Sequence, residues 1–216
     1  YKKIFQTPKF LYAPNSPVII KEGALFLNSE NGSVCAQLKF QNISDKQIVL
    51  LKVKLVLRDT IDRALKEIEE QYLDLSARYG AEFGEEIRID LPEKATRSFD
   101  VSVSEVCFLD KTVWTCGDGE WKSVPSPFPL TSKFDSQYAV LGYRQTLCSR
   151  AICLPMRYED IWVCSCGCIN KNDTLICRHC NANLELMEGA DGKVLENDAL
   201  YDKASKLISS AVSTQI

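Results

Sequence analysis

Five cysteines crowd into one short stretch of the sequence, and their spacing is that of metal ligands. They are Cys164, Cys166, Cys168, Cys177 and Cys180. Thiolates from two short knuckles, held apart by the ten-residue loop Gly167 to Ile176, can close tetrahedrally on one Zn²⁺. The sequence therefore predicts a zinc ribbon in this stretch.

The second knuckle, Cys177-x-x-Cys180, has unambiguous spacing, whereas three cysteines compete for two places in the first knuckle. Gly167 suits a tight turn that points backbone N–H groups at sulfur, which favours the cysteine just before it. The predicted zinc ligands are therefore Cys164, Cys166, Cys177 and Cys180. Cys168 is predicted to be a spare thiol, and its replacement of Cys164 or Cys166 as a ligand is left open.

Four thiolates make a closed site with no position for water or substrate, so we expect a structural zinc. A segment this short buries little core, and metal binding would supply its folding free energy, about 10 kcal/mol or more in zinc-finger peptides. The single histidine, His179, is poorly placed as a ligand beside Cys180 and is predicted to be a bystander. With His179 as a bystander, no imidazole is left for a catalytic pair with serine or cysteine, and we expect the protein not to be an enzyme.

The other five cysteines are scattered and are predicted to be buried core thiols. They are Cys35, Cys107, Cys116, Cys148 and Cys153. Zinc thiolates and free thiols belong in a reducing compartment, so we expect a cytoplasmic protein. The longest apolar stretch, Ile48 to Leu57, contains two lysines and is too short to span a membrane. The chain begins at Tyr1 without signal-peptide features, and we expect it to be part of a longer protein.

The first half of the sequence alternates apolar and polar residues with a period of two, as half-buried strands do. The clearest segments are Val34 to Phe40, Val49 to Leu57 and Phe99 to Val106, with turn signals between them. With 45% hydrophobic and 25% charged residues, the chain has a globular composition. We therefore predict a mainly β protein: an immunoglobulin-like antiparallel β-sandwich, then a small four-cysteine zinc ribbon, then a C-terminal α-helix.

Two helices are predicted after the sandwich. Leu130, Phe134, Tyr138 and Leu141 recur at helical spacing before Gly142, which predicts a short helix that ends at this glycine and packs on the sandwich edge. Residues 197–212 carry a second apolar stripe, with Asn197 or Asp198 as the N-cap. We expect this stripe either to dock back on the protein or to begin a truncated helical repeat.

The sequence divides into four segments on this basis. They are a β-sandwich with an N-terminal extension (1–122), a proline-rich linker and short helix (123–157), the zinc ribbon (158–186), and an acidic connector with an amphipathic helix (187–216).

The ribbon resembles the zinc fingers of the Ran-binding-protein type. The shared pattern is Trp-x-Cys-x-Cys-Gly-x-x-Asn-x6-Cys-x-x-Cys, although the first knuckle here has one residue between its cysteines instead of two or more. In that family two hairpins enclose one zinc, and the resemblance implies that Trp162 and Asn170 support the zinc site structurally, together with Gly167.

The residues with which such fingers bind known ligands are missing from this sequence. Where some fingers carry a ubiquitin-binding Thr-Phe pair, this chain has Gly167 and Cys168, and where others bind single-stranded RNA it has Lys171, Asp173 and Thr174. The formal net charge of the chain is −3, and acidic residues balance the cations of the ribbon. Both features argue against a nucleic-acid partner.

The whole chain also resembles a group of bacterial proteins, from Gram-positive species, that join an N-terminal sandwich, a Trp-x-Cys-x-Cys-Gly ribbon and helical repeats. The matching passages include Ala36 to Lys46, Gln71 to Leu75, Gly80 to Gly84 and Asp160 to Trp162. The resemblance implies this architecture and no particular activity.

The sequence thus predicts a non-enzymatic, zinc-binding scaffold that binds another protein, whose identity and stoichiometry it leaves open. One alternative is a nucleic-acid-binding zinc finger. The other is a thiol redox sensor that pairs Cys168 with a zinc thiolate.

Overall fold

The computed structural model describes residues 1–117, 119–200 and 202, and it divides the chain into two compact units, Tyr1–Val124 and Pro125–Ile216. Eleven strands make up the described part of the first unit. They are β1 (Lys2–Gln6), β2 (Leu11–Tyr12), β3 (Val18–Leu27), β4 (Val34–Asn42), β5 (Ile48–Arg58), β6 (Ala64–Tyr72), β7 (Glu82–Phe83), β8 (Ile89–Asp90), β9 (Ser98–Phe108), β10 (Val113–Thr115) and β11 (Lys122–Ser123).

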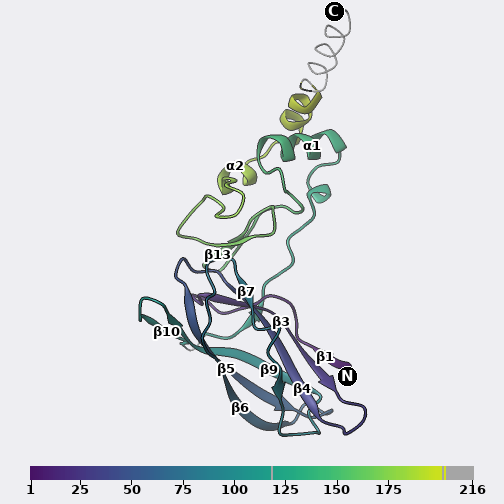
Figure 1. The fold of residues 1–216 in the computed structure, drawn as a ribbon. Coiled ribbons are helices and arrows are strands. Elements are labelled where there is room, and N and C mark those ends of the chain that lie inside the picture. Colours follow the sequence, from purple (N-terminus) through teal and green to yellow (C-terminus); the bar gives the residue numbers. More distant parts are fainter. Residues whose placement is uncertain (118, 201, 203–216) are drawn as a thin grey trace, which may run out of the picture. The chain divides into compact units, whose positions relative to one another are not determined.

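These strands form two antiparallel sheets (Figure 1). One sheet has the order β11-β2-β3-β4-β7, with β1 also paired to β3 and β8 to β4, and the other has the order β10-β9-β5-β6. The strands predicted from alternation are confirmed as β4, β5 and β9. The chain is therefore mainly β with antiparallel sheets, as predicted.

A single hydrophobic core joins the two sheets of the first unit. Ile20 and Phe40 from one sheet and Val53, Leu55 and Val103 from the other belong to one buried cluster. Along β5 the buried positions alternate with half-buried ones that include Lys52 and Lys54. The period-two pattern thus places every second side chain of the central strand in this core.

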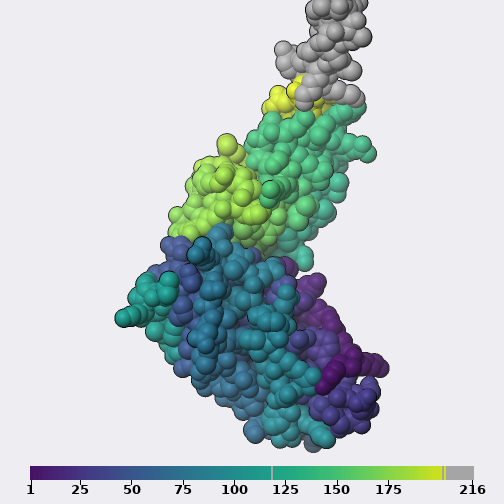
Figure 2. Space-filling view, viewed as in Figure 1, coloured from purple at the N-terminus to yellow at the C-terminus, as the bar shows by residue number. Residues whose placement is uncertain are grey.

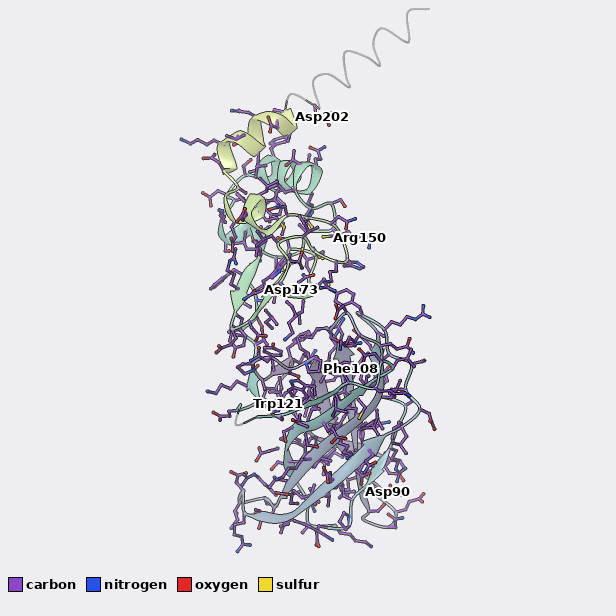
Figure 3. The ribbon with its side chains drawn as sticks, turned by 90° about the vertical axis from the view of Figure 1, so that its left-hand side faces the viewer. Asp90, Phe108, Trp121, Arg150, Asp173 and Asp202 are labelled. Carbon is purple, nitrogen blue, oxygen red and sulfur yellow. The ribbon has the colours of Figure 1, made fainter. Side chains whose placement is uncertain are left out.

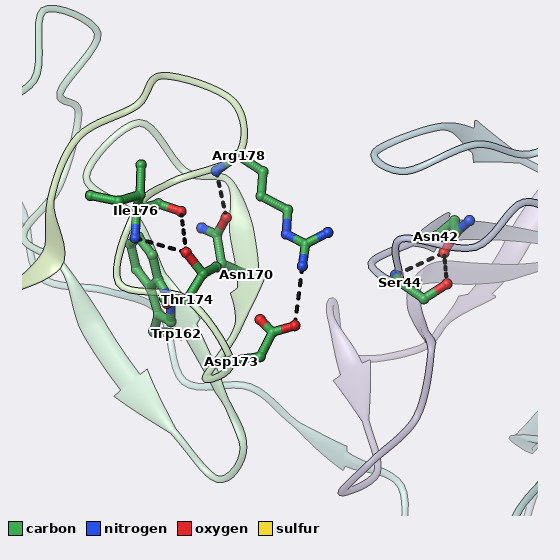
Figure 4. A network of polar contacts seen from close by, with 8 residues as sticks. All are labelled: Asn42, Ser44, Trp162, Asn170, Asp173, Thr174, Ile176 and Arg178. Carbon is green, nitrogen blue, oxygen red and sulfur yellow. Dashed lines mark hydrogen bonds and ion pairs between the residues drawn. The ribbon is translucent and has the colours of Figure 1, made fainter.

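Asn42 is a fully buried polar residue at the end of β4. Its amide nitrogen donates to the carbonyls of Lys46 (2.8 Å) and Ala77 (2.9 Å). Its side-chain oxygen accepts from the backbone N–H and the hydroxyl of Ser44, each at 2.8 Å (Figure 4). Every polar atom of this side chain is satisfied, and the side chain fixes two neighbouring loops.

We expect Asn42→Ala to lower the free energy of unfolding of the first unit by about 2 kcal/mol, because the carbonyls of Lys46 and Ala77 then lose their hydrogen-bond donor. Urea unfolding followed by circular dichroism measures the effect. The matched control is Asn31→Ala, which removes a side chain from an exposed turn. A change no larger than that of the control would contradict this role for Asn42.

The second unit combines short helices with a small sheet. Its elements are a 3₁₀ helix, η1 (Leu130–Ser132), then α1 (Gln137–Thr146), β12 (Met156–Tyr158), β13 (Ile161–Val163), β14 (Ile169–Lys171) and α2 (Leu184–Glu188). The three strands form an antiparallel sheet in the order β12-β13-β14. Residues 192–200 are also helical.

One core spans the segments that the sequence separates into linker and ribbon. Phe134 and Tyr143 from the α1 region belong to the same buried cluster as Trp162, Leu184 and Leu195. In the space-filling view, the green residues that precede the ribbon lie directly against it (Figure 2). The ribbon therefore has apolar support outside its own short sequence.

The predicted helix at Leu130–Leu141 is wrong in its bounds and in its stop. The α-helix begins after Ser136, whose hydroxyl accepts from the N–H of Tyr138, and it continues through Gly142. A Cβ at Gly142 would lie 2.1 Å from the carbonyl oxygen of Leu195. This glycine allows the backbone around Leu195 to approach α1 and does not end the helix.

The C-terminal helix starts earlier than predicted, at residue 192 instead of 197. The Asp191 carboxylate accepts from the N–H groups of Lys193 (2.8 Å) and Val194 (3.2 Å), so Asp191 is the N-cap. Most of the predicted stripe at residues 197–212 lies outside the described residues.

Candidate metal centre

Four cysteine sulfur atoms meet in the second unit. The Sγ atoms of Cys164, Cys166, Cys177 and Cys180 all lie within 4.8 Å of one another. Cys164 and Cys177 are buried, whereas Cys166 and Cys180 are partly exposed. The structure thus brings together all four cysteines that the sequence proposes as ligands, in a cluster that could hold one metal ion.

The first knuckle is the turn between β13 and β14. The N–H of Cys164 donates to the carbonyl of Cys168 (2.8 Å), and the N–H of Gly167 donates to the carbonyl of Cys164 (2.8 Å). Gly167 has a φ of +84°, in the left-handed region that side chains disfavour. The tight turn that places the sulfurs of both Cys164 and Cys166 in the cluster therefore depends on this glycine.

The second knuckle is a turn closed by backbone hydrogen bonds. The N–H of Cys177 donates to the carbonyl of Ala182, and the N–H of Asn181 donates to the carbonyl of Cys177, both at 2.9 Å. Asn181 adopts a φ of +60°, which asparagine tolerates better than most residues. This turn places Cys177 and Cys180 opposite the first knuckle.

Trp162 and Asn170 are cross-strand partners in β13 and β14, and both are fully buried. The indole N–H of Trp162 donates to the carbonyl of Thr174 (2.9 Å) in the loop between the knuckles. The Asn170 amide nitrogen lies 3.6 Å from the Cys177 sulfur, and its oxygen accepts from the N–H of Arg178 (3.0 Å). Both side chains therefore fix the loop and the second knuckle to the sheet.

We expect Asn170→Ala to weaken metal binding by roughly tenfold, because loss of a hydrogen bond to a ligand sulfur costs 10–100-fold in comparable sites. Competition with a chromophoric chelator measures the affinity. Asn172→Ala, an exposed change two residues away, is the control. Equal affinities for the two variants would contradict this role for Asn170.

The thiols of the cluster perturb one another strongly. Hydrogen bonds from Cys164, Cys166 and Cys168 lower the pKa of Cys177 well below its usual range. Hydrogen bonds with Cys166 and Cys177 raise the pKa of Cys164. One thiolate is therefore favoured at the expense of its neighbours, and a bound cation would be needed to hold all four cysteines deprotonated.

Cys168, which the sequence leaves as a possible ligand, lies beside the cluster. Among the described residues, the mutually close set contains Cys164 and Cys166 from the first knuckle and omits Cys168. The Cys168 sulfur contacts the carbonyl of Ile169 at 3.7 Å and the thiol of Cys177.

The scattered cysteines do not share one environment. The prediction of burial is confirmed for Cys35, Cys148 and Cys153, and it is wrong for Cys107 and Cys116, which are partly exposed.

Two of the buried cysteines lie against the knuckles, which the sequence did not predict. Cys148 Sγ is 3.7 Å from Cys180 Sγ, and burial raises the pKa of Cys148 to about 11. Cys153 Sγ contacts the carbonyls of Cys164 (3.7 Å) and Ser165 (3.6 Å). Cysteine spacing could not predict either contact, because both arise only when the loop after α1 folds back onto the ribbon.

Polar contacts attach this loop to both knuckles. The N–H of Ile152 donates to the carbonyl of Ser165 (2.8 Å), and the Ser165 hydroxyl pairs with the Tyr143 hydroxyl (2.7 Å). Arg150, labelled in Figure 3, lies 3.0 Å from Nε2 of His179 in the second knuckle. Because a guanidinium only donates, Nε2 of His179 is the acceptor.

Acidic partners engage the cations around the ribbon. Lys171 pairs with Asp160 (2.9 Å), and Arg178 pairs with Asp173 (3.1 Å). Arg157 makes a two-pronged pair with Glu188, at 2.8 and 3.0 Å. These pairs reduce the positive potential that a phosphate backbone would meet on this surface.

Comparison with protein-family models, curated proteins and solved structures finds no match to this chain. Within the described residues, no helix has the length and apolar character needed to cross a membrane.

Proposed function

We propose that the second unit binds one zinc ion through Cys164, Cys166, Cys177 and Cys180. The sulfur separations support this choice: Cys164 and Cys180 are 3.5 Å apart, and Cys166 and Cys177 are 3.8 Å apart. A tetrahedral ion with Zn–S bonds of about 2.3 Å has edges of about 3.8 Å. Four sulfur ligands in a tetrahedron suit zinc or iron, and zinc is the usual ion of closed structural sites.

The proposed role of the ion is to cross-link the two knuckles. A closed set of four thiolates has no position for a substrate, and this is the single observation that carries the proposal of a structural, non-catalytic site. The buried Trp162 and Asn170 beside it complete a rigid platform. The single histidine, His179, also has a structural role in this proposal, because its hydrogen bond with Arg150 attaches the Cys148 loop to the second knuckle.

We propose that the protein as a whole is a protein-binding scaffold, with an immunoglobulin-like first unit and a zinc ribbon, akin to the bacterial proteins it resembles. Strand β6 supports an interaction role, because it is an edge strand of its sheet and most of its residues are exposed. The ten free cysteines support a reducing, cytoplasmic setting. The ion pairs of the ribbon disfavour the nucleic-acid alternative.

The test of the scaffold proposal uses the full chain loaded with zinc. We expect saturable binding of a partner protein recovered from the source cells, and no turnover in a broad substrate screen. The control is a chain with Leu65→Glu and Leu73→Glu, two exposed apolar residues in β6 and just after it, which should keep its zinc and its fold but lose the partner. Turnover by the loaded chain, or salt-dependent binding of RNA or DNA with no protein partner, would contradict the proposal.

A further inference from the structure

Cys148 is a fifth thiol at the edge of the cluster and has no part in the proposed metal binding. Its sulfur lies 3.7 Å from Cys180, which is as close as the ligand sulfurs lie to one another. Cys148 itself is buried, whereas Cys180 is partly exposed. A buried thiol that is not a proposed ligand therefore lies next to Cys180, one of the two ligands that solvent can reach.

The position of Cys148 is fixed by its surroundings. It follows α1, and its N–H donates to the carbonyl of Tyr143 (3.2 Å), while its own carbonyl accepts from Ala151 (3.0 Å). Two residues after Cys148, Arg150 donates a hydrogen bond to His179, the residue that precedes Cys180. These contacts hold the backbone of the Cys148 loop beside the second knuckle, which carries Cys180.

We propose that Cys148 and Cys180 form a disulfide when a hydroperoxide attacks the metal site, and that this bond releases the ion. The inference rests on the proposed metal site. An S–S bond is about 2.05 Å long, so the two sulfurs need to approach by less than about 2 Å. Three ligands then remain, and the site is no longer closed.

The chemistry balances with hydrogen peroxide as the oxidant. The Cys180 thiolate attacks one peroxide oxygen, the O–O bond breaks, hydroxide leaves, and Cys180 becomes a sulfenic acid. The Cys148 sulfur then attacks the Cys180 sulfur, the S–S bond forms as the S–O bond breaks, and the hydroxyl leaves with the Cys148 proton as water. The two sulfurs lose two electrons, and the peroxide gains them.

Cys164 is the competing partner, since its sulfur lies 3.5 Å from that of Cys180. In the loaded site, however, attack by Cys164 would cost the ion a second ligand, whereas Cys148 can attack without breaking a bond to the ion. Cys168 is the other nearby thiol, but its thiol hydrogen-bonds to Cys177, the first cysteine of the second knuckle. The geometry therefore favours Cys148 as the resolving thiol.

The test is peroxide titration of the zinc-loaded full chain, with released zinc followed by a chromophoric chelator and with peptide mapping under non-reducing conditions. We expect a linked peptide that joins Cys148 to Cys180 and appears in step with zinc release. Cys148→Ser should bind zinc normally, lose the linked peptide, and release zinc more slowly by roughly tenfold, because the resolving thiol is absent. Cys153→Ser, a matched change at a buried thiol in the same loop, should behave as the wild type.

Four outcomes would overturn the inference. They are unchanged release from Cys148→Ser with a Cys164–Cys180 disulfide, slowed release only in Cys168→Ser, release with no disulfide, and loss of zinc from Cys148→Ser before any oxidant, which would make Cys148 a ligand. A wild-type chain that never takes up zinc would instead refute the proposed function, and the inference with it.

Discussion

Replacing Cys177 with serine should remove the metal ion and unfold the second unit while the first unit stays intact. A neutral hydroxyl cannot replace a thiolate, and binding to four-cysteine and related structural sites is worth about 10–16 kcal/mol in zinc-finger peptides. Cys177 is also the buried cysteine on which the hydrogen bonds of its neighbours converge. The loss should therefore exceed what the apolar core of the second unit can offset.

Metal analysis and limited proteolysis measure this effect. The wild type should hold one equivalent of zinc, and Cys177→Ser should hold almost none and lose residues beyond about 125 to the protease. Cys116→Ser, at a partly exposed cysteine of the first unit, is the control and should match the wild type. A Cys177→Ser chain with a full equivalent of zinc and a protected second unit would show that the assigned ligand is wrong.

Replacing Trp162 with alanine should lower the free energy of unfolding of the second unit by about 3–5 kcal/mol, the usual cost of removing a buried large aromatic side chain. Trp162 has no exposed surface, and it belongs to the core cluster that also contains Tyr143, Leu184 and Leu195. Its loss also leaves the carbonyl of Thr174 without the indole donor. The substitution thus empties the centre of the unit and frees the loop between the knuckles.

Urea unfolding at saturating zinc checks this value, because excess metal keeps the ligand set filled. Trp162→Phe is the matched variant: it retains an aromatic ring, loses the hydrogen bond to Thr174, and should cost less than the alanine change. A loss of under about 1 kcal/mol for Trp162→Ala would contradict a central packing role, since such values are typical of surface sites.

The sequence was sufficient for features that local chemistry decides. Period-two alternation located β4, β5 and β9, because one face of each strand packs in a core shared by two sheets. Cysteine spacing and the glycine at residue 167 led to the same four sulfurs that the structure gathers. Both signals are short-range, and each comes from residues that directly form the structure concerned.

Strand β6 shows where local chemistry fails. Its sequence contains Lys66, Glu67, Glu69 and Glu70, residues that favour helices and are depleted in strands. It is nevertheless a strand, because it pairs with β5 along most of its length, and Lys54 forms an ion pair with Glu67 (2.7 Å). The pairing partner decides the conformation here, and a single segment carries no sign of it.

Gly142 and Cys148 show the same limit in the second unit. Gly142 is predicted from the sequence to end a helix, but in the structure it allows the close approach of Leu195, more than 50 residues later in the chain. Cys148 reads as an ordinary core thiol, and only the fold of its loop places it against Cys180. Such roles depend on contacts between distant segments, which spacing along the chain does not encode.

X-ray absorption at the zinc edge of the loaded full chain tests the central claim most directly. The account predicts four sulfur neighbours at about 2.3 Å and no nitrogen or oxygen in the first shell. A nitrogen neighbour, which would bring His179 into the coordination shell, or an oxygen neighbour from water would contradict the closed four-thiolate site.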